Sequence, residues 1–360
     1  MTADSNNDNA LVQLERRQAL QLIRLNRPKA LNALNLELIE ALTLALQQAF
    51  DDDSVRSIWL ESSTEKAFCA GGDVKTLAIE LAGQPADEQR RIGHRYFAAE
   101  YQLDAMIEHS PKPIVAFGRG LVMGGGWGLF AGADLRLVDR SSRFAMPELQ
   151  IGLFPDVGAG HFLQKPDWRA GTLIGISGIH LSMLDVLALE YAHAEVDDQE
   201  VAALQAELAG GELPEQQELA KPNSEIQAHR QAWQQALASL GEPLLSDWMH
   251  AVRSSDFAPF QAAADQWRTA SALSIAHCWY HFKRLRQASR VEALEMDLTV
   301  GSNACSEREF LEGVRALLID KDKQPAWLYP SVTSVPFSLI ERFYQPLPFT
   351  TETTYPASNT

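Results

Sequence analysis

Apolar residues follow two different spacings along the first half of the chain. Short apolar runs bounded by glycine or proline are typical of buried strands. Between these runs, apolar residues recur every three or four positions, as they do after Asn35, where Leu38, Leu42 and Leu46 share one helical face. Asn35 is a favourable N-cap for this helix, which the pattern extends to about Phe50. The alternation of strands and helices predicts an α/β core. The predicted strands are 19–25, 56–61, 113–117 and 135–138.

The pattern changes after about Asp185, where strand-like runs become rare. Apolar residues from Val201 to Leu208 keep helical spacing until Gly210, and a second apolar helical face runs from Ile226 to Leu240. The predicted organisation is a polar tail over 1–10, a core over 11–195 and a helical C-terminal region over 196–360, with its most mobile connection at 210–222.

Composition and charge exclude several classes of protein. A chain of 360 residues that is 46% hydrophobic can bury one large core or two smaller ones. The net charge of −16 argues against a nucleic-acid partner, because phosphate contacts need clustered Lys and Arg. No run of about 18 apolar residues is present, so we expect no membrane span. Three cysteines form no disulfide framework and the N-terminus has no apolar signal segment, so we expect a reduced, cytoplasmic protein.

Two glycine turns at strand ends offer a place for an oxyanion. Gly124-Gly125-Gly126 separates a strand-like segment from a helix-like one, and Phe68–Asp73 contains a second pair of glycines. Glycine permits close approach of the backbone, and the first N–H groups of a helix are unpaired donors with partial positive charge. Two such turns can each direct one N–H to the same oxygen, as a thioester enolate or tetrahedral oxyanion requires.

Two carboxylates follow in a largely apolar segment. Glu148 comes directly after Pro147, and is either a solvated loop residue or a partly desolvated acid or base with a raised pKa. Asp156 is either a turn residue or a second carboxylate in the same pocket, if the loop folds back. Taken alone, Glu100 fits an exposed position on a helix.

These motifs resemble a known family. The sequences Ala-Gly-Gly-Asp at 70–73, Met-Gly-Gly-Gly at 123–126 and Phe-Ala-Met-Pro-Glu at 144–148 are similar to those of the crotonase (enoyl-CoA hydratase/isomerase) superfamily, which acts on acyl-coenzyme A thioesters. Within it, FAMPELQIGLFPDVG at 144–158 and FLEGVRALLIDKDKQPAW at 310–327 most resemble the 3-hydroxyisobutyryl-CoA hydrolases. The resemblance is good over about 10–195 and moderate over 270–330.

The resemblance implies a fold and a site. The fold would be a crotonase-like spiral of ββα units with an α-helical C-terminal region that trimerises or covers the active site. Gly72 and Gly125 N–H groups would polarise the thioester carbonyl, and Glu148 would attack it or activate water. Asp156 and Glu100 would hold the 3-hydroxyl group or the water. The remaining substrate-binding positions that it implies are Ala70, Gly71, Asp73 and Gly124.

The expected activity is therefore hydrolysis of a short 3-hydroxyacyl-CoA, with two alternatives. One is an enoyl-CoA hydratase or isomerase, although the position where hydratases carry a second glutamate is Gly128 here, and glycine cannot move a proton. The other is a non-catalytic acyl-CoA-binding protein. We expect no metal and no cofactor beyond the coenzyme A of the substrate, and a trimer-based homo-oligomer. Cations that could meet the coenzyme A phosphates, or simply be solvated, are Arg24, Arg27, Lys29, Lys321 and Lys323.

Overall fold

The computed structural model describes residues 10–213, 219, 223–241 and 244–350, and the chain divides into two compact units that alternate along the sequence. The described residues of Met1–Gly72, Gln102–Phe144 and Leu181–Gln227 form unit 1. Those of Asp73–Tyr101, Ala145–His180 and Ala228–Thr360 form unit 2. The units cut across the predicted ranges 11–195 and 196–360, which remain a prediction. Most of the predicted polar tail and part of the predicted connection 210–222 lie outside the described residues.

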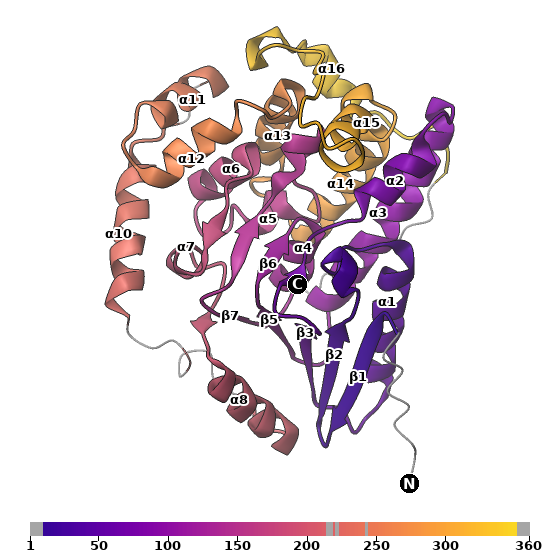
Figure 1. Ribbon diagram of the computed structural model, residues 1–360, viewed down its shortest axis with the longest axis vertical. Coiled ribbons are helices and arrows are strands. Elements are labelled where there is room, and N and C mark those ends of the chain that lie inside the picture. The colour runs from indigo at the N-terminus through magenta and orange to yellow at the C-terminus, as the bar shows by residue number, and fades with distance from the viewer. Residues whose placement is uncertain (1–9, 214–218, 220–222, 242–243, 351–360) are drawn as a thin grey trace. The chain divides into compact units, whose positions relative to one another are not determined.

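Unit 1 is built around two sheets (Figure 1). The six-stranded sheet has the order β1 (Val12–Arg17), β2 (Leu20–Leu25), β3 (Ser57–Ser62), β5 (Ile114–Gly118), β7 (Leu135–Val138) and β10 (Ala194–Glu195). The four-stranded sheet has the order β4 (Ala67–Cys69), β6 (Leu121–Met123), β8 (Arg143–Ala145) and β9 (Leu181–Ser182). Successive strand pairs along the chain, β3–β4, β5–β6 and β7–β8, each place one strand in each sheet, and the first two pairs lead into helices. This is the predicted ββα repeat.

The strands and the helix predicted from the spacing of apolar residues are present in the structure. The four predicted strands appear as β2, β3, β5 and β7, and β2, β3, β5 and β7 are mutually parallel neighbours. Helix α1 (Leu36–Asp51) begins where predicted, because the Asn35 side chain accepts a hydrogen bond from the Leu38 N–H at 3.2 Å. Strand β1 was not predicted. It pairs antiparallel with β2 at the edge of the sheet, where alternating polar residues are tolerated.

Helix α8 (Asp198–Gly210) belongs to the core of unit 1. Its residues Leu204 and Leu208 are buried against Leu22 and Trp59 of the sheet. The predicted helical face was therefore correct, and it covers strands that lie far away in sequence. Unit 1 also contains α4 (Gly125–Ala131), α7 (Met183–Ala188) and the short 3-10 helix η1 (Pro28–Ala30).

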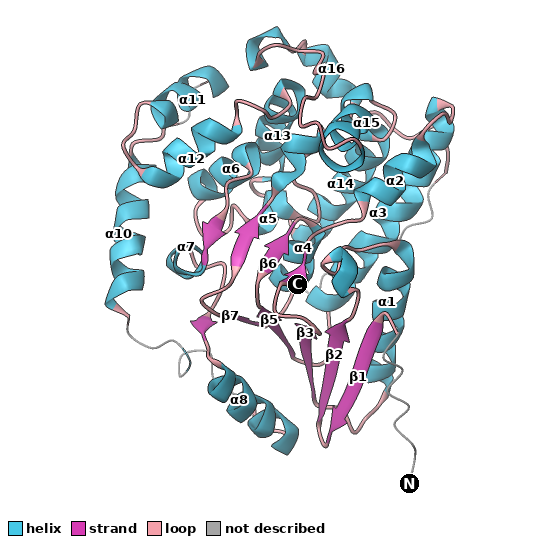
Figure 2. Ribbon diagram, in the orientation of Figure 1, coloured by secondary structure: helices cyan, strands magenta, loops and turns pink. Residues whose placement is uncertain are grey.

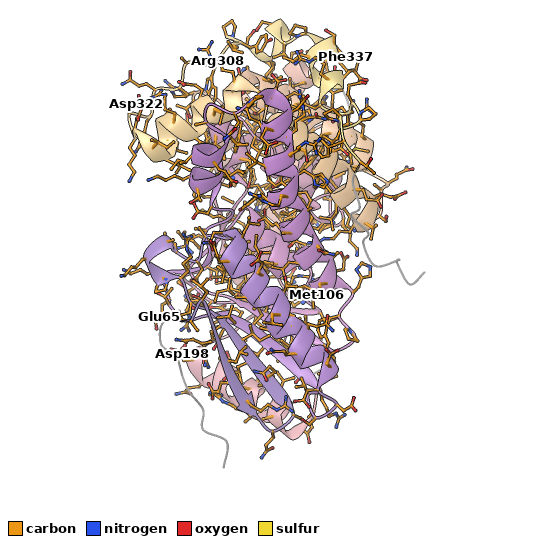
Figure 3. All side chains as sticks on the ribbon, turned by 90° about the vertical axis from the view of Figure 1, so that its right-hand side faces the viewer. Glu65, Met106, Asp198, Arg308, Asp322 and Phe337 are labelled. Atoms are coloured by element: carbon orange, nitrogen blue, oxygen red, sulfur yellow. The ribbon has the colours of Figure 1, made fainter. Side chains whose placement is uncertain are left out.

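An ion-pair cluster ties the loops of unit 1 together. Arg119 donates to Asp139 at 2.7 Å, lies 3.6 Å from Glu65 and also donates to Asp198 at the start of α8. Glu65 and Asp198 are accordingly close together in Figure 3. A single guanidinium thus links residues from four separate stretches of the chain.

Unit 2 is almost entirely helical (Figure 2). Helix α3 (Ala86–Glu108) runs from unit 2 into unit 1. The buried helix α13 (Ala272–Leu285) contacts α5 (Ala159–Phe162), α6 (Trp168–Ser177) and α16 (Phe337–Arg342). No described helix is long and apolar enough to cross a membrane. The other helical elements are α2 (Val74–Leu81), η2 (Pro147–Ile151), α10 (Ser224–Ala238), α11 (Leu245–Arg253), α12 (Ala258–Gln266), α14 (Arg290–Ala304), α15 (Arg308–Val314), η3 (Arg315–Ile319) and η4 (Val332–Ser334).

Candidate active site

Glu148 lies in the short 3-10 helix η2 of unit 2. Its side chain is buried, and its Oε2 atom has no hydrogen-bond partner among the described residues. A buried polar atom without a partner costs free energy, so it is retained where it serves a ligand or a reaction. The structure therefore excludes the solvated-loop alternative for Glu148.

Helix α15 fixes the backbone that carries Glu148. A Cβ atom on Gly313 would lie 2.3 Å from the carbonyl carbon of Ile151, so only glycine allows α15 to approach η2 this closely. On another side, the Ser271 N–H donates to the Leu149 carbonyl at 3.0 Å, and the Ser271 hydroxyl donates to the buried carboxylate of Glu309. The C-terminal motif recognised in the sequence thus supports the loop of the proposed catalytic glutamate.

Asp156 and Glu100 are brought into the same buried region of unit 2. Asp156 Oδ2 accepts a hydrogen bond from the Tyr101 hydroxyl at 2.6 Å, and Tyr101 follows Glu100 on α3. Glu100 is 2% exposed, so the exposed-helix alternative is wrong for this residue. The charges of Glu100 and Asp156 both raise the pKa of Tyr101, after the larger effect of burial.

Burial and like charges hold these carboxyl groups towards their neutral forms. The pKa of Glu148 is raised well above its ordinary value, first by burial and then by the charge of Asp156. Burial raises the pKa of Asp156 to about 7, with a further rise from Asp297 that the Tyr101 hydrogen bond opposes. Groups that interact in this way lose their protons as a coupled set. One of the pair can therefore act as an acid near neutral pH while the other acts as a base.

The glycine turns meet in unit 1. Strands β4 and β6 are parallel neighbours, so their carboxyl ends lie at the same edge of the sheet. A Cβ atom on Gly126 would lie 2.5 Å from the Cys69 carbonyl oxygen, which shows how closely the two turns pack. Among the described residues, neither the Gly72 N–H nor the Gly125 N–H donates a hydrogen bond. Both donors are free to meet a ligand oxygen.

The remaining predicted binding residues differ in whether their polar groups are already bonded within the protein. The Ala70 N–H donates to the Leu31 carbonyl at 3.0 Å. The Asp73 carboxylate caps α2 by accepting from the Thr76 N–H at 3.2 Å, which gives it a structural role. Gly71 and Gly124 are buried, and both have positive φ angles, 97° and 50°. Arg24 bonds to Glu15 at 2.7 Å and to Glu61 at 2.6 Å, so a structural ion-pair network occupies it.

Sequence reasoning missed the residues that support Asp156. Tyr101 could have been noticed beside Glu100, but Asp297 on α14 lies 139 residues from its partner Gly158 and belongs to no recognised motif. His281 Nε2 and Asp297 Oδ1 share a hydrogen bond of 2.6 Å. The sequence signal was an aspartate placed among apolar residues of a helical face, between Leu294 and Leu298.

No group of three or more His, Cys, Asp or Glu side chains in the described residues could hold a metal ion. His277 and His281 are buried beside Phe154, with ring centroids 5.1 and 4.9 Å away. Burial lowers the pKa of both imidazoles, that of His281 to about 3. They therefore pack as neutral rings near the Asp156 loop.

Comparison with known proteins finds relatives that belong to one family of acyl-CoA enzymes. A family model described as enoyl-CoA hydratase/isomerase matches residues 20–344. The mitochondrial 3-hydroxyisobutyryl-CoA hydrolase of Gallus gallus is 31% identical, over 93% of this chain and 89% of that protein. The protein of the same name from Rattus norvegicus is 34% identical, over 89% of this chain and 85% of that protein.

Solved structures agree on the fold. An enoyl-CoA hydratase from Rhodobacter sphaeroides matches with a TM-score of 0.84 and 30% identity, over 94% of this chain and 98% of that one. A carnitinyl-CoA dehydratase from Mycobacterium thermoresistibile matches with a TM-score of 0.80 and 28% identity, over the same shares of 94% and 98%. The predicted crotonase-like α/β fold is confirmed.

One prediction is wrong by this comparison. The relatives are mitochondrial proteins, which contradicts the cytoplasmic location that we expected. The three cysteines are indeed buried free thiols, but a reduced state does not separate the cytoplasm from other reducing compartments. The match over residues 20–344, the relatives and the shared fold together show that this chain belongs to the enoyl-CoA hydratase/isomerase (crotonase) family.

Proposed function

We propose that the chain hydrolyses the thioester of a short 3-hydroxyacyl-CoA, with 3-hydroxyisobutyryl-CoA as the leading candidate. The observation that carries the proposal is the buried pair Glu148 and Asp156, in which one oxygen of Glu148 has no hydrogen-bond partner in the part of the chain that the structure describes. The names of the relatives support the same substrate. Position 128, where the family resemblance puts a second glutamate in hydratases, is a buried glycine of α4.

Each group has a chemical role in this proposal. The N–H groups of Gly72 and Gly125 stabilise the negative charge that develops on the thioester oxygen. Glu148, once deprotonated, either attacks the carbonyl carbon and expels the coenzyme A thiolate to leave a mixed anhydride, or takes a proton from the attacking water. Water completes the first route by hydrolysing the anhydride. Asp156, held by Tyr101, orients the 3-hydroxyl group or the water.

A second candidate function is hydration of an enoyl-CoA. It is favoured by the solved relative from Rhodobacter sphaeroides, which is an enoyl-CoA hydratase and is 30% identical. Hydration adds water across a double bond and releases no coenzyme A, so a thiol assay separates the two reactions.

The first prediction concerns the reaction. Mixing the protein with 3-hydroxyisobutyryl-CoA should release free thiol, and crotonyl-CoA should lose its enoyl absorbance much more slowly, because Gly128 supplies no second acid or base. Rapid loss of the enoyl absorbance without thiol release from the hydroxy ester would contradict the proposed hydrolysis. It would favour the hydratase instead.

The second prediction concerns Glu148. Glu148→Gln keeps the shape of the side chain and removes its charge, so kcat should fall by about 10²–10⁴ while coenzyme A binding stays nearly unchanged. Glu195→Gln is the control, because Glu195 pairs with Arg140 at 3.0 Å in unit 1 and should matter little. In ¹⁸O-labelled water, a single turnover should place label in the protein if Glu148 is the nucleophile. Label found only in the released acid would give no support to attack of water on a glutamyl carbonyl.

The third prediction concerns the oxyanion donors. Gly126→Ala places a Cβ atom against the Cys69 carbonyl oxygen, at 2.5 Å before relaxation, and should displace the start of α4 with the Gly125 N–H. Losing one oxyanion donor typically costs about 10²–10³ in kcat. Gly210→Ala is the control, since nothing lies within 4 Å of its added Cβ. A folded Gly126→Ala variant with nearly wild-type kcat would remove Gly125 from the mechanism.

The fourth prediction concerns stability and pH. Folded Asp156 keeps its proton up to a pKa of about 7, whereas the unfolded chain loses it near 3.8. The folded state therefore binds more protons between these values, and Asp156 destabilises the fold increasingly as pH rises from about 4 to 7. At pH 8, Asp156→Asn should have a higher free energy of unfolding than wild type, by up to about 4 kcal/mol, as measured by urea denaturation. This gain in stability should vanish near pH 4. An equal gain at both pH values would show that burial does not perturb this group.

A further inference from the structure

The loop that carries Asp156 makes an unusual turn. Val157 and Gly158 have φ angles of 52° and 76°, and the Ala159 N–H donates to the Asp156 carbonyl at 2.8 Å. This is the pattern of a type I′ β-turn, which needs positive φ at both central residues. Glycine adopts such an angle readily, but a β-branched valine does so only under strain, so the surroundings must hold the turn in place.

Asp297 supplies one of the restraints. This fully buried aspartate of α14 accepts the Gly158 N–H at Oδ2, at 2.8 Å, and contacts His281 Nε2 through Oδ1, at 2.6 Å. Both carboxylate oxygens are therefore used. The bond to Gly158 fixes one side of the strained turn directly.

Arg290 supplies the other restraint from the same helix. Its Nη2 atom donates to the Val157 carbonyl at 3.4 Å, and its Cγ and Nε atoms would lie 3.1 Å from a Cβ on Gly158. Two residues of helix α14 thus form hydrogen bonds with the turn, Arg290 with the Val157 carbonyl and Asp297 with the Gly158 N–H. Because the turn follows Asp156 directly, its geometry sets where the Asp156 carboxylate points.

We propose that Asp297 is a positioning residue for the hydrolysis proposed above: it holds the strained turn that presents Asp156. The inference rests on the proposed function for its kinetic part only. Burial raises the pKa of Asp297 itself to about 8, so Asp156 and Asp297 titrate over overlapping pH ranges and ionisation of either carboxyl group opposes ionisation of the other.

Several other groups face Asp156 and stay unchanged in the test. The groups that bear on Asp156 or on its turn are Tyr96, Glu100 and Tyr101 of α3, Glu148 of η2, Arg290 of α14, Cys305 at its end and, through its hydrogen bond to Asp297, His281 of α13. A change seen on substituting Asp297 alone is therefore attributable to that carboxylate.

Two substitutions separate position from charge. Asp297→Asn keeps an oxygen that can accept the Gly158 N–H, so kcat at its optimum should remain within about threefold of wild type. Asp297→Ala removes the acceptor and releases the turn, so kcat should fall at least about tenfold with little change in KM, as misplaced catalytic groups do. Asp167→Asn is the control for changing an aspartate that accepts a backbone N–H, as Asp167 does at 2.7 Å at the start of α6, and kcat should stay close to that of wild type.

The effect of Asp297 on the ionisation of Asp156 is measured by carboxyl ¹³C NMR of protein labelled at aspartate. The Asp156 signal is assigned by its loss in Asp156→Asn. In wild type, Asp156 should titrate in two steps, since two interacting carboxyl groups share their protons. In Asp297→Asn the coupling of Asp156 to Glu148 remains, but the midpoint of the Asp156 titration should fall by at least about half a pH unit. The inflection in the plot of kcat against pH should move in the same direction.

Two results would overturn the proposal. One is an Asp156 titration that is identical in wild type and Asp297→Asn. The other is a folded Asp297→Ala variant whose kcat stays within threefold of wild type. Absence of thiol release by wild type from every acyl-CoA ester would instead refute the proposed function, and the NMR titration would still test the effect of Asp297 on Asp156.

Discussion

The burial of several carboxyl groups in unit 2 is the constraint on which the proposed chemistry depends. In water, neighbouring carboxylates ionise almost independently, but in a dry interior each negative charge raises the pKa of the next. Glu148 and Asp156 therefore remain protonated at pH values where exposed carboxyl groups are ionised. The arrangement destabilises the folded state near neutral pH, which is a common property of catalytic sites.

The helices of unit 2 provide the scaffold that such burial needs. Helix α15 reaches η2 through Gly313, and Glu309 ties Ser271 to the same region, so the backbone of Glu148 is braced from two sides. Helix α14 does the same for Asp156 through Asp297 and its hydrogen bond to Gly158. The C-terminal helices thus form part of the proposed catalytic apparatus, since they hold in place the two loops that carry the buried carboxyl groups, one of which is strained at Val157.

Unit 1 supplies rigidity of a different kind, because its proposed functional atoms belong to the backbone. The parallel pairing of β4 with β6 brings the two glycine turns to one edge, and the contact between Gly126 and Cys69 leaves no room for a side chain. Backbone N–H groups held in this way need no reorganisation when charge develops on an oxygen. A substitution that merely adds a methyl group is therefore expected to act on the reaction.

The sequence by itself determined much of this protein. Apolar spacing located β2, β3, β5, β7 and the faces of α1 and α8, and glycine and carboxylate motifs identified the family and the candidate residues, because these signals depend on neighbours a few positions apart. Only the tertiary structure decided that Glu100 is buried, that Tyr101 donates to Asp156 and that Asp297 holds the turn. It also decided how unit 2 is assembled from distant segments, with η2 braced by α15. Burial, pKa shifts and contacts across 139 residues arise from packing, which no local pattern encodes.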